Sequence, residues 1–314
     1  MITVNEKEHV FHLHNGRMSY LLYVMESGQL GHLYFGKELR TDGSYLHMVE
    51  KAHRPMTTYI NEGDLYTSYE HLRQEYPTYG TSDYRYPALE VQGEDGSALC
   101  KLEYQGYKIV PGKKPLEGLP ATYVEDPSEA ETLEIWMLDQ WRKLEVVLSY
   151  TIFRDCDAIA RSVRFVNQGE KVLFLDRAMS LSLDFPDADY ESVQLSGSWA
   201  RERSIVTRPL QPGVTAVSSM RGNSSHQHNP FSGLFSVLLG VYLFSLLSAT
   251  VLHFFLGVFF HFITGADIKS WHLMLMSSMF SRLCSYRSRS SSYRRRSSSC
   301  SRSSWSFSST SERM

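Results

Sequence analysis

Residues 132–184 read TLEIWMLDQWRKLEVVLSYTIFRDCDAIARSVRFVNQGEKVLFLDRAMSLSLD and contain four apolar runs separated by short polar stretches. In the second run, every second residue from Leu144 to Ile152 is large and apolar, whereas Glu145 and Ser149 lie between them. This period of two is typical of a β-strand with one buried face. A helical interpretation would place Gly and Pro inside helices, at a cost of about 1–3 kcal/mol each. The stretch therefore predicts consecutive antiparallel strands.

The chain also begins with short alternating blocks, HVFHLHN, MSYLLYVME and QLGHLYFGK, separated by Asn15-Gly16 and Ser27-Gly28. Asn-Gly between such blocks is a hairpin signal, and we expect a type I′ turn there because both residues tolerate positive φ. Residues 99–104 and 107–110 are predicted as two further short strands. Many strands separated by turns predict an all-β fold, a large antiparallel β-sandwich.

Residues 41–73 lack periodicity and are expected to form a long loop that leaves the sheet. Loops of this length are commonly functional or disordered. The side chains that could bind a ligand are Tyr45, His47, Glu50, His53 and Tyr59. Two interpretations stay open here, a binding loop and an ordinary surface loop.

Charge is distributed unevenly along the chain. Residues 1–230 contain 23 Lys and Arg against 32 Asp and Glu, residues 231–265 contain no charged side chain, and residues 266–314 contain nine basic and two acidic residues. An acidic body argues against a nucleic-acid partner, because neutralising phosphates requires clustered Lys and Arg. The four cysteines lack metal-ligand spacing, and no secretion signal is evident at the N-terminus, so we expect a cytoplasmic protein.

Two histidines on one predicted strand face, His12 and His14, are the nearest approach to a metal site in the N-terminal region. No third ligand is evident nearby, and a structural zinc site needs four. We interpret both as packed or solvated strand residues and expect no metal.

Residues 195–203, LSGSWARER, place Trp199 between small residues and ahead of alternating charges. An exposed indole can stack on the apolar face of a sugar while polar groups bind its hydroxyls. The alternative is that Trp199 is an ordinary core residue.

Seven short motifs occur in the same order as in one known protein family. They are QEYPTYG…DYRYPA (74–88), LPATYVE (119–125), EAETLEI (129–135), DFPDADY (184–190), GSWARER (197–203), RPLQPGV (208–214) and RGNSSHQHNPF (221–231). Residues 1–231 resemble the N-terminal domain of bacterial α-galactosidases of glycoside hydrolase family 36. The resemblance implies a β-supersandwich and a cytoplasmic, often tetrameric enzyme. It also implies removal of terminal α-D-galactose from melibiose or raffinose with retention of configuration.

The same resemblance implies two sugar-binding residues in this chain. Trp199 matches the tryptophan that lines the galactose pocket, and Glu50 aligns with an acidic loop residue that is Asp in the family. His226 and His228 are interpreted as structural. The resemblance also implies that both catalytic aspartates lie in a barrel domain, the nucleophile within a Lys-Trp-Asp motif that does not occur among these 314 residues. We therefore expect no catalytic residue and no cofactor here, and a chain that is inactive alone. A non-catalytic galactose-binding module is the alternative.

Beyond residue 231 the composition changes. Residues 232–265 are uncharged and apolar, and 266–314 form a tail in which 18 of the 35 residues from 277 to 311 are serine. One explanation is a membrane anchor, because roughly 20 apolar residues span a bilayer. The other is a frameshift, which we favour because the change falls inside the resembling domain. In either case we expect an incomplete sandwich followed by a disordered tail.

Overall fold

The computed structural model describes residues 1–41, 43–53, 60, 62–116, 122–185, 189–217 and 228–236, and the backbone of 305–307. The side chains of residues 228, 230 and 236 are also outside this description. The chain forms two compact units, Met1–Phe185 with Ser304–Met314, and Pro186–Ser303. Within the described ranges the only helices are two 3-10 turns, η1 (Leu46–Met48) and η2 (Pro127–Glu129). No described helix has the length and apolar character needed to cross a membrane.

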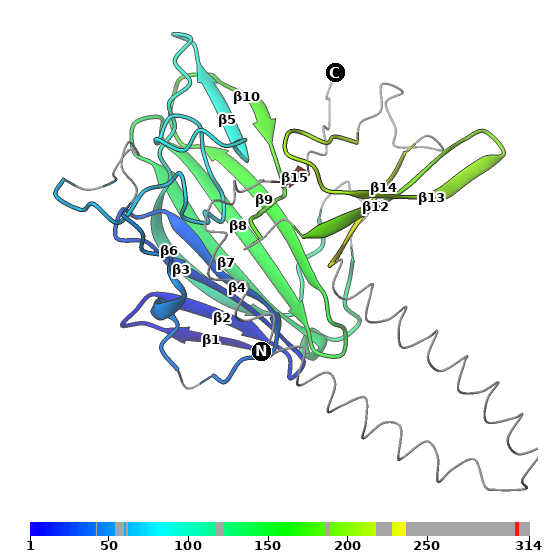
Figure 1. The fold of residues 1–314 in the computed structure, drawn as a ribbon. Helices are drawn as coiled ribbons and strands as arrows, with labels where there is room; N and C mark the ends of the chain where they lie inside the picture. The colour runs from blue at the N-terminus through cyan, green and yellow to red at the C-terminus, as the bar shows by residue number, and fades with distance from the viewer. Residues whose placement is uncertain are drawn as a thin grey trace, which may run out of the picture. The chain divides into compact units, whose positions relative to one another are not determined.

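The predicted all-β fold is confirmed (Figure 1). In the first unit one sheet has the order β1 (Ile2–Asn5), β2 (Val10–His14), β3 (Met18–Val24) and β4 (Leu30–Lys37). A second sheet has the order β6 (Glu103–Pro111), β7 (Ala130–Asp139), β8 (Leu144–Phe153) and β9 (Ile159–Asn167). Two smaller pairs join β5 (Leu89–Gly93) to β10 (Leu173–Ala178), and β11 (Leu181–Leu183) to β15 (Trp305–Phe307).

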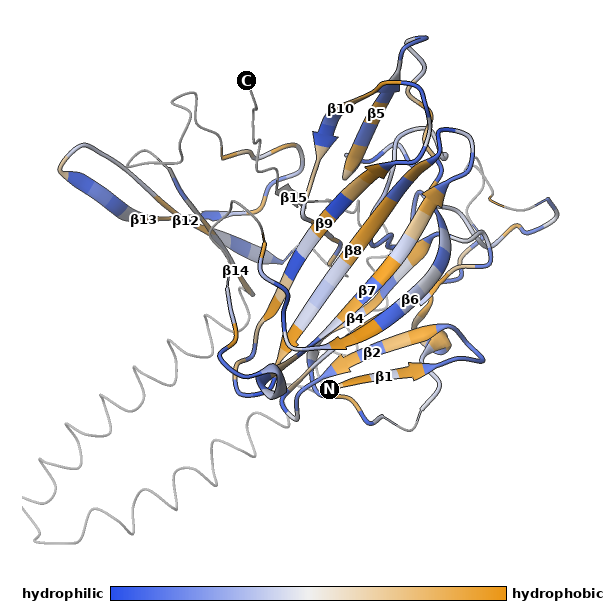
Figure 2. Cartoon of the chain, turned by 180° about the vertical axis from the view of Figure 1, so that it is seen from behind, coloured by the Kyte–Doolittle hydropathy of each residue, from blue (hydrophilic) through white to orange (hydrophobic). Residues whose placement is uncertain are grey.

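The two four-stranded sheets share one apolar core. Phe11 and Leu22 from the first sheet lie in the same buried cluster as Leu133, Leu148 and Ile152 from the second. Each fully buried side chain of this size contributes about 1.5–3 kcal/mol. On β8 every second residue from Leu144 to Ile152 is buried as expected, but Val147 and Thr151 on the opposite face are buried too, so the strand is not exposed along one face. Figure 2 shows alternating apolar and polar bands along the neighbouring β9. The architecture is the antiparallel β-sandwich that the sequence predicts.

Two local predictions need correction. The hairpin at Asn15-Gly16 is present, but only Gly16 has positive φ (88°), so the turn is not type I′. The Asn15 side chain instead accepts hydrogen bonds from the backbone N–H groups of Arg17 and Met18, at 3.1 and 3.0 Å. Residues 103–111 form one strand, β6, where two were expected, because a bulge at Gln105 interrupts its side-chain alternation without ending its pairing.

The described residues of the loop expected at 41–73 do not leave the sheet but pack over the outer face of the first sheet. The loop residues Tyr45, Tyr69 and Leu72 form a second buried cluster with Leu21 and Leu33. The central strands β2 and β3 are consequently buried on both faces, which is why they contain few polar residues.

The loop also helps to bury His12, which contacts Tyr45. Its Nε2 lies 2.7 Å from the Ser19 hydroxyl, and the Tyr45 ring contacts its imidazole edge-to-face. Burial, with the nearby His14 as a smaller cause, lowers the pKa of His12 to about 4. His12 is therefore a neutral, packed histidine at ordinary pH.

The second unit contains a three-stranded sheet in the order β13 (Arg201–Pro209), β12 (Tyr190–Ser198) and β14 (His228–Ser236). All pairings in it are antiparallel. Strand β14 crosses residue 231, where the sequence predicts the first domain to end. The described part of the apolar segment thus begins as a strand, and the rest of 232–265 lies outside the described residues. The expected division into three domains stays a prediction.

Candidate functional site

Trp199 lies at the tip of the β12–β13 hairpin. Ser198 pairs with Arg201, which leaves Trp199 and Ala200 as the two turn residues. Ala200 has φ 61°, a left-handed conformation that suits such a turn. Its backbone N–H donates to the Glu202 carboxylate at 2.9 Å. The backbone conformation of this turn therefore fixes the position of Trp199 at the tip of the hairpin.

Gly197 makes this turn possible. A Cβ atom at Gly197 would lie 2.1 Å from the carbonyl oxygen of Arg201, far inside contact distance. The strand pairing also shifts its register between Ser196 and Ser198, so a bulge tightens the hairpin. The small residues that precede Trp199 in the sequence are thus explained by the close approach of the two backbones.

The indole of Trp199 is 82% exposed, which excludes the core interpretation. Arg201, Glu202 and Arg203, which follow it, are also exposed. An apolar plate beside hydrogen-bonding groups of both charges is the kind of surface that sugar-binding sites use.

Glu50 lies in the first unit, two residues after η1, and is half-buried. The preceding turn is anchored by Tyr45, whose hydroxyl donates to the Arg40 carbonyl, and His47 and His53 are exposed on either side. Tyr59 lies outside the described residues. Because Trp199 and Glu50 belong to different units, each described by itself, their joint role in one pocket stays a prediction. His226 and the side chain of His228 lie outside the described residues.

A buried charge network in the sandwich core was not expected from the sequence. The Arg161 guanidinium lies 2.7 Å from Glu75 Oε1, and the hydroxyls of Tyr20 and Tyr150 donate to the same oxygen at 2.6 and 3.1 Å. His32 Nδ1 lies 3.4 Å from the other carboxylate oxygen. The sequence does contain a signal for it, because Arg161 falls on the same strand face as the apolar Ile159.

Electrostatics keep Glu75 ionised despite its position. Burial alone would raise its pKa, but the charge of Arg161 and the hydrogen bonds to its oxygens outweigh this effect, and its pKa is lowered. Burial raises the pKa of Tyr20 and Tyr150, so both hydroxyls are protonated donors. The arrangement is a structural network that joins both sheets, with Glu75 Oε1 bonded to Tyr20, Tyr150 and Arg161, whereas Glu75 Oε2 and His32 Nδ1 make no hydrogen bond among the described residues.

Asp83 and Arg85 form an ion pair within the DYRYP motif. Arg85 Nε and Nη2 bond the two Asp83 oxygens at 2.9 and 2.8 Å, and Nη1 bonds Asp184 at 2.8 Å. Burial raises the pKa of Asp184, and the charge of Arg85 opposes that rise. Two sequence motifs 99 residues apart, DYRYP and DFPDADY, are thus joined by one guanidinium.

The first unit is an antiparallel β-sandwich, and the second carries an exposed aromatic hairpin. Residues 28–236 match the family profile described as Glycosyl hydrolase family 36 N-terminal domain. The chain belongs to glycoside hydrolase family 36, and the matched region is its N-terminal domain.

Curated relatives agree with this membership. Alpha-galactosidase AgaA of Geobacillus stearothermophilus is 46% identical over 233 residues, which are 74% of this chain and 32% of AgaA. Alpha-galactosidase 1 of Pediococcus pentosaceus is 40% identical over 240 residues, 74% of this chain and 32% of that protein. The chain therefore spans about a third of the length of the curated relatives it matches.

Solved structures give the same result. The crystal structure of α-galactosidase AgaB from G. stearothermophilus matches with a TM-score of 0.70 and 45% identity, over 76% of this chain and 32% of AgaB. A variant of AgaA in complex with raffinose matches with a TM-score of 0.70 and 46% identity, over 73% of this chain and 32% of AgaA. The β-sandwich seen in this chain is thus shared with this family's enzymes.

Proposed function

We propose that this chain supplies the N-terminal β-sandwich of an α-galactosidase that removes terminal α-D-galactose from oligosaccharides such as melibiose and raffinose. In this proposal Trp199 stacks on the galactose ring and Glu50 accepts hydrogen bonds from its hydroxyls. The observation that carries it is the exposed Trp199 on a turn fixed by its backbone, within the region that matches the family. The names of the relatives, all α-galactosidases, support the substrate class.

The proposal assigns no catalytic residue to these 314 residues. A retaining glycosidase needs two carboxyl groups about 5–5.5 Å apart that flank the scissile bond. The family resemblance implies that both are aspartates of a barrel domain and that the nucleophile lies in a Lys-Trp-Asp motif, which this sequence does not contain. The role left to this chain is sugar binding.

Location and assembly follow from the same resemblance. We propose a cytoplasmic protein, with a homo-tetramer as the assembly of the complete enzyme. A membrane location through residues 232–264 is the alternative, and it is tested by whether the protein is recovered in the soluble fraction.

The purified 314-residue chain is expected to release no p-nitrophenol from p-nitrophenyl α-galactoside above the rate without enzyme. The physical reason is that ring stacking alone supplies neither a nucleophile nor an acid. AgaA from G. stearothermophilus, assayed in parallel, provides the positive control. If α-galactosidase activity co-eluted with the purified chain, the chain itself would contain catalytic residues, and the proposal would be wrong.

Galactose is expected to shift the resonance of Trp199 in the fluorotryptophan-labelled chain, and to do so saturably. The label reports each of the five tryptophans separately once their signals are assigned with Trp→Phe variants. Contact between a sugar face and the exposed indole changes the environment of Trp199, whereas Trp136 on β7 should not respond.

The matched control is Ile205→Ala, which truncates another exposed apolar side chain on β13, 74% exposed, and should leave the Trp199 response unchanged. Trp199→Ala should change the free energy of unfolding by no more than about 0.5 kcal/mol, because the side chain is exposed. If the chemical shift of Trp199 does not change up to about 100 mM galactose, Trp199 does not take part in sugar binding by this chain.

A further inference from the structure

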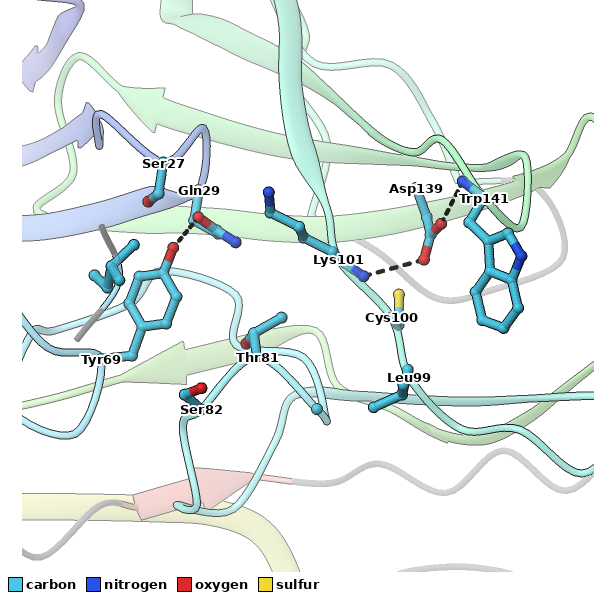
Figure 3. Close-up of a pocket in the computed structure, with 12 residues that line it drawn as sticks. Ser27, Gln29, Tyr69, Thr81, Ser82, Leu99, Cys100, Lys101, Asp139 and Trp141 are labelled. Carbon is cyan, nitrogen blue, oxygen red and sulfur yellow. Dashed lines mark hydrogen bonds between the residues drawn. The ribbon is translucent and has the colours of Figure 1, made fainter. Parts of the chain in front are cut away.

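The first unit contains a cavity of about 400 Å³ that the proposed function does not use. Figure 3 shows Gln29 and Tyr69 on one side of it and Asp139 and Trp141 on the other, with Leu99 also in its wall. The volume is within the range of small-molecule pockets, about 300–1,000 Å³. Neither Trp199 nor Glu50 is among the described residues that line this cavity.

Gln29 is a buried residue of the cavity wall with one polar group that lacks a partner. Gln29 is 6% exposed, and its Oε1 accepts a hydrogen bond from the Tyr69 hydroxyl. Its Nε2 has no hydrogen-bond partner among the described residues, and Figure 3 shows it pointing into the cavity. Leaving a buried amide unpaired costs about 1–3 kcal/mol. A ligand hydroxyl can both donate and accept, so it satisfies this amide in either orientation of the side chain.

The opposite wall holds an exposed tryptophan in a fixed turn. Trp141 is 65% exposed, and its backbone N–H and that of Arg142 each donate to Asp139 Oδ1 at 2.9 Å. Arg142 is itself bonded to the carbonyls of Leu99 and Ser97, each at 2.7 Å, and its guanidinium lies 4.9 Å from the indole centroid. These contacts hold Trp141 in place before any ligand arrives, which reduces the entropy cost of binding.

The charged residues of the cavity wall are already paired. Among the described residues that line it, only Lys101 and Asp139 carry charge. Lys101 Nζ lies 2.7 Å from Glu103, and Asp139 accepts three backbone N–H groups, including that of Lys101 at 3.1 Å. The Lys101 charge is already paired and the Asp139 carboxylate is already hydrogen-bonded, whereas a neutral hydroxylated ligand needs no counter-charge.

We propose that this cavity is a binding site for a small neutral saccharide, whose ring stacks on Trp141 and whose hydroxyl pairs with the Gln29 amide. The Thr81 and Ser82 side chains in the wall offer further hydroxyl partners. This inference stands apart from the proposed function, because it uses other residues and makes no demand on Trp199.

The test uses the fluorotryptophan-labelled 314-residue chain carrying Trp199→Ala, so that any response comes from elsewhere. Glucose, galactose and sucrose are titrated in turn, with inorganic phosphate as the charged probe. We expect at least one sugar to shift the Trp141 resonance with half-saturation at or below about 10 mM. The Trp136 resonance and the phosphate titration should show no change.

Gln29→Met keeps a side chain of similar size and removes the amide, and it should weaken the Trp141 response about tenfold or more. Trp141→Ala retains the backbone N–H that bonds Asp139, so it should fold normally and lose sugar binding in equilibrium dialysis. The proposal is overturned if no sugar saturates the Trp141 signal, if phosphate does, or if neither variant weakens binding. A failure here leaves the Trp199 result untouched, because the two sites are read from different resonances.

Discussion

Arg161→Met is expected to lower the free energy of unfolding by about 3–5 kcal/mol, measured by urea denaturation at pH 7. The substitution removes the guanidinium 2.7 Å from Glu75 and leaves that carboxylate, with 0% exposure, without a compensating charge. The hydroxyls of Tyr20 and Tyr150 still donate to it, but two neutral hydrogen bonds do not offset the desolvation of an ion. A loss of this size is a large part of the stability of an ordinary domain.

The matched control is the double variant Arg161→Met with Glu75→Gln. The amide oxygen that Glu75→Gln introduces can accept from the same two hydroxyls, and the side chain carries no charge, so the double variant should recover most of the loss. Equal destabilisation in the single and double variants would mean that packing of the Arg161 stem, and not the charge pair, is responsible.

The pH dependence of the single variant should have a recognisable sign. In the unmodified chain the pKa of Glu75 is lowered, so its contribution to stability is present above its unfolded pKa and is lost as pH falls. Without Arg161 burial dominates and raises the folded pKa of Glu75, and the variant is then penalised as pH rises. Arg161→Met should therefore lose less stability relative to the unmodified chain at pH 5 than at pH 7.

The sequence predicts those strands whose hydrophobic residues alternate and whose pairing partners are adjacent in the chain. The strand from Leu144 to Phe153 repeats every two residues, and its neighbours are joined to it by short turns, so both the strands and their order follow. The pairing of β5 with β10 could not be foreseen, because Leu89 and Ala178 are far apart in the chain and no local pattern encodes their contact. The loop cover over the first sheet was missed for a related reason, since Tyr45, Tyr69 and Leu72 show no periodicity.

The candidate site shows the same division. The exposure of Trp199 follows from its sequence neighbours, because Gly197 permits the tight hairpin that carries it. The Gln29 cavity could not be predicted, because it brings together residues from the start of β4, the segment around Leu99 and the β7–β8 turn. A site residue such as Trp199 could be predicted because its exposure depends on neighbouring residues in the sequence. The cavity could not be predicted because its wall depends on contacts between distant segments.

Arg85→Met is the second large effect we expect, with a loss of about 3 kcal/mol or more in the free energy of unfolding. Besides Asp83 and Asp184, the guanidinium bonds the carbonyls of Tyr69 and Leu72 at 3.0 and 2.7 Å. A single side chain thus connects Tyr69 and Leu72, at the end of the loop that packs over the first sheet, to Asp184. Methionine fills the volume but leaves two nearly buried carboxylates without their positive partner and two carbonyls without the guanidinium donor, although Asp83 still accepts from Gln74 Nε2 and from the backbone N–H of residue 85.

Two further variants separate the fork geometry from charge alone. Arg85→Lys keeps the positive charge but cannot bond both oxygens of Asp83 and also reach Asp184, so it should recover only part of the loss. Arg177→Met removes an arginine that stacks on Tyr86 and pairs with Glu90 nearer the surface, and it should cost about 1 kcal/mol or less. If Arg85→Lys were as stable as the unmodified chain, a point charge would suffice at this position. The acceptors of Arg85 come from three separate segments. We therefore expect lysine to replace the charge of Arg85 but not the several donors of its planar guanidinium.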